Sequence, residues 1–164
     1  MTDPGPRLRE PRERVSPRAR TMWTLTAAAG GTVLVVALAV AGPLSGWLPI
    51  PWWLVALVAL GAATYVAAVP RWRYAVHRWE ITESAVYTQT GWWVRERRIA
   101  PMSRIQTVDH VEGAVARLFG LSTVTVTTAS AAGALTIAGL ERPRALALVD
   151  ELTLMADSVP GDAT

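Results

Sequence analysis

The sequence predicts a two-helix transmembrane hairpin followed by a small α+β domain, in which a bent antiparallel sheet or partial barrel is capped by a C-terminal helix. Three observations lead to this prediction. Residues 21–70 contain no charged side chain, and arginines lie on both sides of them. Short segments between 73 and 138 have the alternation and turn residues that are typical of strands. Residues 143–156 repeat apolar side chains at helical spacing.

The uncharged segment is too long for one membrane span and suits two. Three prolines and two glycines within 42–51 interrupt a continuous helix. We therefore expect spans at about 22–41 and 52–69, each long enough at ~1.5 Å per residue to cross a ~30 Å hydrocarbon core. A buried hairpin of a soluble domain would need a polar shell that 164 residues do not supply. Small residues, including Gly31 and Ala63, are expected to let the two spans approach closely.

The flanks of the hairpin predict its orientation. Arginines precede the first span and follow the second, whereas the loop between the spans has none. Short arginine-rich segments stay in the cytoplasm, so we expect both termini there and the loop outside. An alternative is that the first span is a signal peptide cleaved after Ala39-Val40-Ala41. Glu10, Glu13 and the full membrane length of the span argue against cleavage, and the second span would keep the C-terminal part inside in either case.

The chain divides into four segments. We expect residues 1–21 to be a disordered basic tail, because they are rich in proline, arginine and acids and lack apolar periodicity. Residues 22–70 form the hairpin, 71–157 a cytoplasmic domain, and 158–164 a disordered C-terminus.

Composition narrows the classes of function. All sixteen basic residues are arginine, as in proteins from GC-rich genomes, and the sequence pI is near 10.2. The arginines gather at the membrane ends and within 95–104, a placement that suits an anionic inner leaflet and not nucleic acid. The chain has no cysteine, which excludes disulfides, a thiol nucleophile and cysteine metal sites.

The domain is expected to contain strands followed by one helix. The expected strands are 73–82, 86–90, 92–100, 103–111, 122–128 and 134–138. A bulge is needed in the fourth strand, because Ile105 and Val108 fall on opposite faces. One helical turn over 115–119 is expected to end at Gly120. The final helix presents one apolar face, made of Ala145, Leu148, Val149, Leu152 and Met155.

Two motifs carry a family resemblance. After the two spans come Arg104-Ile105-Gln106-Thr107-Val108 and then Arg117-Leu118-Phe119-Gly120-Leu121. In this order and spacing, the chain resembles the YdbS-like bacterial pleckstrin-homology (PH) family over about residues 22–155. The resemblance implies a PH-like fold in a bacterial plasma-membrane protein without an agreed molecular activity. It also implies a link to antimicrobial-peptide tolerance or envelope stress, and a larger partner with several PH domains.

Recognition of inositol lipids is not expected. PH domains that bind phosphoinositides carry basic residues in the first hairpin turn, whereas this turn is Thr82-Glu83-Ser84. The motif residues are instead assigned to maintaining the fold; they are Arg104, Ile105, Gln106, Val108, Arg117, Phe119 and Gly120. Gln106 is expected to hydrogen-bond neighbouring backbone, and Arg117 to pair with Asp109 or Glu112.

The sequence contains no constellation typical of an enzyme. His77 and His110 have no metal-ligand spacing, and Asp109 with Glu112 is better explained as solvated loop acids. A glycine-rich phosphate loop is absent from the sequence. Two spans without an ionisable group offer no proton or ion path. We therefore expect no catalytic residue, cofactor or metal.

A basic strip beside two tryptophans is the candidate contact with lipid head groups. It consists of Trp92, Trp93, Arg95, Arg97, Arg98 and Arg104. Arginines near an anionic surface contribute about 1 kcal/mol each, and tryptophan suits the interface. The alternative is a solvated edge strand whose charges prevent aggregation, since Arg97 and Arg98 should face opposite sides.

Two functions stay open. The first is a membrane-tethered module that binds a partner protein at a sheet edge. The second is a protein that handles anionic lipids or peptides at the bilayer. The sequence also leaves a homo-oligomer open.

Overall fold

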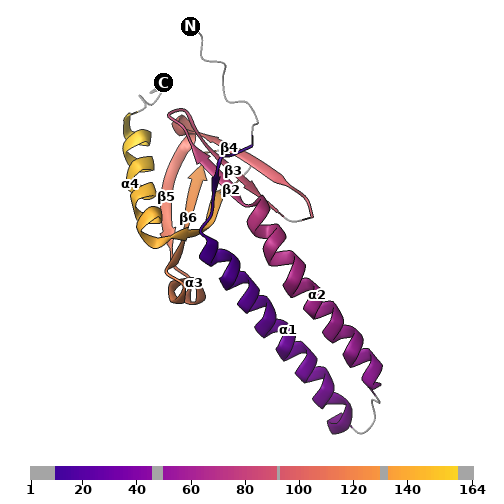
Figure 1. Ribbon diagram of the computed structural model, residues 1–164. Helices are drawn as coiled ribbons and strands as arrows, with labels where there is room; N and C mark the ends of the chain where they lie inside the picture. Colours follow the sequence, from indigo (N-terminus) through magenta and orange to yellow (C-terminus); the bar gives the residue numbers. More distant parts are fainter. Residues whose placement is uncertain (1–9, 46–49, 92, 130–132, 159–164) are drawn as a thin grey trace. The chain divides into compact units, whose positions relative to one another are not determined.

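The computed structural model describes residues 10–45, 50–91, 93–129 and 133–158 (Figure 1). The chain forms two compact units. The hairpin unit comprises Arg20–Trp72, and the domain comprises the described residues up to Ala19 together with those from Arg73 onward.

The hairpin unit contains most of α1 (Pro17–Ser45) and α2 (Trp52–Val76). Both helices are long and apolar enough to cross a membrane, with mean hydropathies of 2.0 and 1.9. Pro17 occupies the first turn of α1, where its missing N–H leaves no helical bond unmade. Each helix extends beyond the predicted span at its arginine-bearing end, over 17–21 in α1 and 70–76 in α2. At its other end, α1 also continues through Pro43 to Ser45, so the helix ends later than the prolines and glycines of 42–51 predicted.

The two helices pack closely where small residues meet. A Cβ added to Gly31 would stand 3.2 Å from the Cβ of Ala62, whereas a Cβ at Gly30 would meet nothing within 4 Å. The predicted close approach is therefore present at Gly31. Such contacts between backbones are how helices associate in lipid, which provides no hydrophobic driving force between them.

The domain is built from two antiparallel sheets and a C-terminal helix. The first sheet has the order β1 (Glu13–Arg14), β2 (Arg78–Ile81), β3 (Ala85–Thr90), β4 (Glu96–Pro101). The second has the order β5 (Ile105–Val111), β6 (Leu121–Thr128), β7 (Leu135–Glu141). The connecting elements are η1 (Met102–Arg104) between the sheets and α3 (Ala114–Leu118) between β5 and β6, and α4 (Arg142–Ser158) follows β7. This architecture confirms the predicted fold class.

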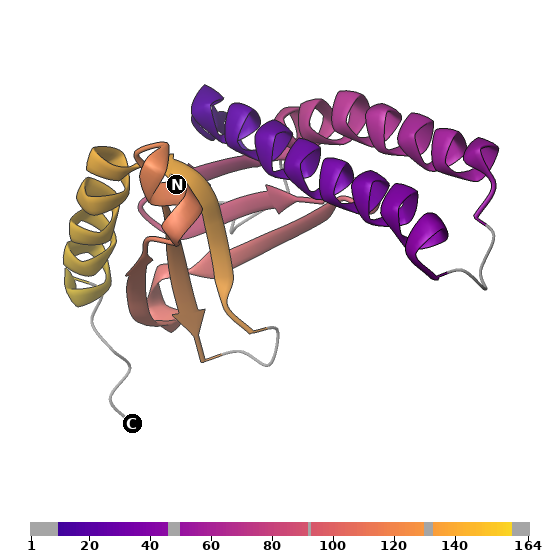
Figure 2. The ribbon, with the colours of Figure 1, turned by 90° about the horizontal axis from the view of Figure 1, so that it is seen from below.

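The helix α4 lies against the second sheet (Figures 1 and 2). Ala145, Leu148 and Leu152 of the predicted apolar face are fully buried, while Val149 and Met155 are half-buried. Opposite them, the valines of β6 are buried and its alternating threonines are half-exposed, except at the strand end. The core of the domain therefore lies between α4 and the inner faces of the sheets.

The strand predicted over 73–82 is wrong in its first half. Arg73–Val76 continues α2, and the His77 N–H donates to the Arg73 carbonyl at 2.9 Å. The strand itself is β2. The strand predicted over 92–100 is β4, which begins only at Glu96, because Thr90 of β3 already pairs with Glu96 across the connection.

The predicted bulge in β5 is confirmed. Ile105 pairs with Thr128 and Thr107 with Thr127, so Gln106 is the extra residue. The helical turn predicted before Gly120 is also confirmed as α3, and Gly120 ends it with a φ of 65°.

The N-terminal arm, residues 10–16, is an ordered part of the domain. β1 pairs with β2, and the Ser16 N–H donates to the Gly139 carbonyl of β7 at 2.9 Å. Gly139 is the extra residue of a second bulge and has a φ of 81°, a conformation that glycine adopts without strain. Pro11 is fully buried and Val15 is 3% exposed. The arm thus bridges the two sheets.

This finding corrects the prediction of a disordered tail over 1–21. Residues 10–21 form the arm and the first turns of α1, because contacts with β2 and β7 order a segment that has no apolar periodicity of its own. Residues 1–9 lie outside the described residues. At the other end, α4 includes Ser158, and residues 159–164 lie outside the described part of the chain.

Candidate functional site

The β3–β4 tip, residues 91 and 93–95, is the part of the domain that displays Trp93 and Arg95 of the predicted strip. Gly91 has a φ of 105°, and a Cβ at this position would clash with the Val94 carbonyl oxygen, so only glycine fits the turn. Trp93 is 85% exposed and Val94 is 72% exposed, next to an exposed Arg95. Trp92 lies outside the described residues.

A buried glutamine connects this hairpin to the last turn of α2. Gln89 is 1% exposed, and its Nε2 donates to the Val76 carbonyl at 3.1 Å. That carbonyl ends a helix and needs a partner outside it. The Oε1 of Gln89 accepts a hydrogen bond of 2.8 Å from Nε of Arg97. Gln89, which contacts the end of α2, therefore lies only two residues before the start of the β3–β4 tip.

Sequence reasoning missed Gln89. The available signal was a single amide inside a strand that is otherwise buried, Val86–Gln89. A buried amide needs partners for both its donor and its acceptor. The partners, a helix carbonyl and an arginine, come from segments that only the fold brings together.

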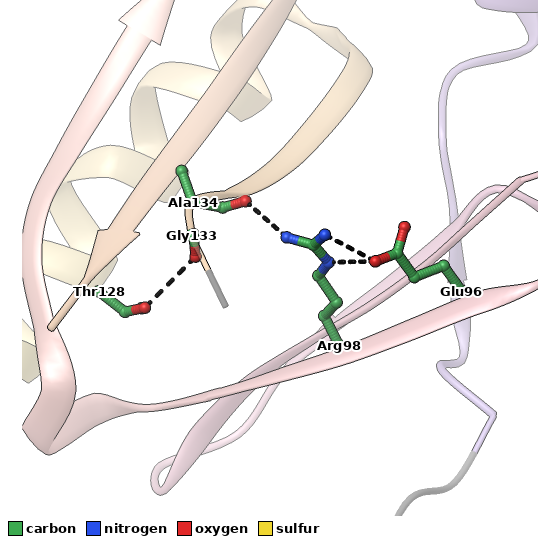
Figure 3. A network of polar contacts seen from close by, with 5 residues as sticks. All are labelled: Glu96, Arg98, Thr128, Gly133 and Ala134. Atoms are coloured by element: carbon green, nitrogen blue, oxygen red, sulfur yellow. Dashed lines mark hydrogen bonds and ion pairs between the residues drawn. The ribbon is translucent and has the colours of Figure 1, made fainter. Parts of the chain in front are cut away.

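Arg98 points away from Arg97, as predicted. Its Nε and Nη2 contact Oε1 of Glu96 at 2.6 Å, and its Nη1 donates to the Ala134 carbonyl at 3.2 Å (Figure 3). These contacts link β4 to the residue before β7. They border a polar cavity of about 240 Å³, lined by Thr88, Thr90, Glu96, Arg98, Ala134 and Thr136.

The predicted basic strip is therefore not one surface. Arg95 and Arg97 lie at the β3–β4 tip, whereas Arg98 bridges the two sheets. Arg104 lies in η1, beyond the opposite end of β4. The pairing of Thr90 with Glu96 and of Ala85 with Pro101 sets these ends about 17 Å apart at ~3.4 Å per residue.

The motif residues have mixed positions. Gly120 closes α3, and its carbonyl accepts from the Arg142 N–H at 3.0 Å. Gln106 is exposed at the bulge, so its amide does not need the backbone partner that was expected for it. The expected pairing of Arg117 with Glu112 is also wrong, because Glu112 binds Nε of Arg142 at 2.8 Å.

The remaining motif residues lie in η1, in β5 and directly after α3. Ile105, Val108 and Phe119 are half-buried, and the Arg104 side chain is exposed while its carbonyl accepts from the Ala129 N–H at 3.0 Å. Asp109, the other expected partner of Arg117, accepts a hydrogen bond from the Thr107 hydroxyl at 3.4 Å.

His77 follows α2 directly and is buried. Its pKa is lowered from 6.5 to about 4, first by burial and then by the positive charge of Arg73, against an opposing effect of the backbone hydrogen bond. His77 is therefore neutral at pH 7.

His110 lies elsewhere, with Nε2 3.6 Å from Oε1 of Glu112. Among the residues the structure describes, no group of three His, Asp or Glu side chains could hold a metal ion.

Comparison with known proteins agrees with this architecture. Residues 27–156 match the family model of the bacterial PH domain. The chain is 28% identical to the UPF0699 transmembrane protein YdbS of Bacillus subtilis (strain 168) over 151 residues. The matched region covers 90% of this chain and 94% of that protein. No solved structure matches the chain. Neither description names an enzymatic activity. Two membrane-capable helices and a family match over most of its length identify the chain as a membrane protein of the bacterial PH domain family.

Proposed function

We propose that this protein is non-enzymatic and presents its PH-like domain at the inner leaflet of the plasma membrane as a protein-interaction module. The observation that carries the proposal is the open edge of β5. This strand ends its sheet, and none of its seven residues is buried. An exposed edge offers unpaired N–H and C=O groups to an extended segment of a partner.

Strand pairing supports the inner-leaflet position. β1 precedes the first span and pairs with β2, which follows the second span. A hairpin flanked by two paired strands must enter and leave the membrane on the same side. The arginines on both flanks favour the cytoplasmic side.

The chemistry of the edge favours an extended polar segment. The exposed side chains of β5 include Gln106, Thr107 and Asp109. A second bacterial PH-domain membrane protein, including a larger one with several copies, could supply such a segment from within the same membrane. We place the role of this pairing in envelope maintenance, including tolerance of antimicrobial peptides, on the family resemblance alone.

Site-specific photo-crosslinking in cells would test the interaction. A photoreactive residue at Thr107 or Asp109 should give one dominant protein adduct, identified by mass spectrometry. The matched control is the same residue at Leu154, an equally accessible position on α4. Equal adducts from all three positions, or none from β5, would contradict the proposal; an adduct to the same chain would identify a homo-oligomer.

Direct action at the bilayer is a second candidate, favoured by the exposed Trp93 and Val94 beside Arg95. An environment-sensitive fluorophore at Trp93→Cys in the full chain should report an apolar surrounding in anionic vesicles. Arg95→Gln should weaken this signal if the arginine contacts anionic head groups. If the signal in neutral vesicles equals that in anionic vesicles, lipid charge plays no part in the contact.

A further inference from the structure

The α3 corner, residues 111–120, exposes apolar side chains that the described part of the domain leaves uncovered. Leu118 is 84% exposed, and Val111 and Val115 are about half exposed. Val115 and Leu118 are three residues apart, so they lie on the same side of α3. None of the five residues of α3 is buried. A helix usually forms in a protein by burying an apolar face, and this one buries none against the domain.

The corner lies where the chain passes from the domain to the first span. A Cβ added to Gly120 would stand 3.6 Å from Nη1 of Arg18. The Gly120 carbonyl also accepts from the Arg142 N–H, which fixes the corner to the start of α4. Arg18 is only three residues before Thr21, where the uncharged segment of 50 residues begins. Gly120, at the end of the corner, therefore contacts a residue that lies only a few positions before the uncharged segment in the sequence.

The charges around the corner suit an anionic bilayer surface. Arg18, Arg117 and Arg142 are exposed, and Arg117 stands between the two apolar side chains of α3 in the sequence. Two acids lie close by: Glu112 is paired with Arg142 at 2.8 Å, and Glu141 accepts a hydrogen bond from the Ser16 hydroxyl at 3.1 Å. A short helix with apolar residues among arginines binds the boundary between head groups and acyl chains.

We propose that Val115 and Leu118 insert into the lipid interface beside the first span, with Arg117 at the head groups. The α3 corner then holds the domain against the inner leaflet at a second point, away from the β3–β4 tip. This inference rests on the inner-leaflet position in the proposed function and is independent of any partner at β5.

The absence of cysteine makes a direct test available. Leu118→Cys and Leu154→Cys are labelled with the same environment-sensitive fluorophore in the full chain, reconstituted in vesicles of phosphatidylcholine and phosphatidylglycerol. Leu154 is a matched control, because it is 71% exposed and follows Arg142 by twelve residues of α4. That separation is about 18 Å along the helix. Nitroxide-bearing lipids should quench the probe at 118 at least twofold more than the probe at 154.

Each other outcome overturns the inference. Equal quenching at 118 and 154 means that the corner is in water. A probe at 118 that is shielded from both lipid nitroxides and aqueous iodide means that a protein, including a second copy, covers it. A third probe, at Trp93→Cys, tests separately whether the domain lies at the membrane at all. Quenching at 93 without quenching at 118 would show that the domain contacts the membrane but that α3 does not. A charged variant, Leu118→Glu, should at least halve the quenching of a probe at Val115→Cys.

Discussion

At the scale of single residues, His77 predicts a pH-dependent stability of the domain. Its pKa is about 4 in the folded protein and 6.5 in the unfolded chain, so protons bind preferentially to the unfolded state between these values. The stabilisation is complete above pH 6.5 and is lost as the pH falls towards 4. The loss is on the order of 2–3 kcal/mol. Thermal unfolding of the full chain at pH 7.5 and pH 4.5 would measure it.

The variant His77→Gln separates this effect from the titration of carboxylates. Gln carries no titratable proton, so the variant should lose less of its melting temperature between the two pH values than the natural chain. An identical loss in both proteins would show that burial of His77 does not control the pH dependence.

Two glycines with positive φ provide a matched pair of predictions. Gly91 and Gly133 have φ values of 105° and 78°, but only a Cβ at Gly91 clashes with backbone, at Val94. Gly133→Ala should cost about 1–2 kcal/mol for the backbone conformation alone. Gly91→Ala should cost more, because the β3–β4 tip must also move. Similar free energies of unfolding for the two variants would contradict the tight turn at Gly91.

At the scale of elements, the N-terminal arm should stabilise both sheets. Val15 is buried and its neighbour Arg14 is exposed, so the same substitution tests burial at one position and charge at the other. Val15→Asp buries a charge and should release the arm. Arg14→Asp should leave the arm in place. Hydrogen exchange of β2 and β7 measures the difference: faster exchange with Val15→Asp alone is expected, and equal rates in both variants would contradict it.

The packing of the two spans gives a second prediction at this scale. Gly31→Leu should separate α1 from α2, because its side chain must enter the space occupied by Ala62. Gly30→Leu is the control, since a Cβ there meets nothing within 4 Å. Spin labels at the exposed positions Val36 and Leu57 report the distance between the helices. A longer distance is expected for the Gly31 variant alone.

Some elements were predicted correctly from the sequence and others were not. The difference is whether an element is specified by a local sequence pattern or by contacts with distant segments. The alternation of valine and threonine in β6 and the apolar face of α4 are local patterns, and both elements form as predicted. The arm is ordered by β2 and β7, which are more than 60 residues away in the chain, and no local pattern announces it. The end of α2 likewise depends on Gln89.

The candidate site was predicted in the same uneven way. The sequence showed tryptophans and arginines close together after the second predicted strand, and Trp93 and Arg95 are exposed there in the structure. Strand register decides which of these side chains share a surface, and it separates Arg98 and Arg104 from the tip. The α3 corner was missed as a surface, because only the fold shows that the described part of the domain leaves Val115 and Leu118 exposed.

At the scale of the whole molecule, the pairing of β1 with β2 joins the segments that precede and follow the hairpin. The two strands are separated in sequence by the entire hairpin, so the first sheet is complete only after both helices of the hairpin have been synthesised. Chain closure over such a distance is slow compared with local pairing. The domain without its arm is therefore expected to exist briefly during synthesis, with the free edges of β2 and β7 exposed.

A disulfide across this strand pair tests the arrangement. Arg14 and Arg78 are direct partners in the antiparallel register, and such partners have the Cα separation that a disulfide needs. The variant with cysteines at 14 and 78 should cross-link on mild oxidation of isolated membranes. A variant with cysteines at 14 and at exposed Ser84, at the far end of β2, should not. In intact cells, an impermeant maleimide should label Pro51→Cys and neither Arg14→Cys nor Arg78→Cys. If only one of the last two is labelled from outside, β1 and β2 are on opposite sides of the membrane and the sheet cannot close. If both are labelled, the strands share the outer side and the cytoplasmic orientation is wrong.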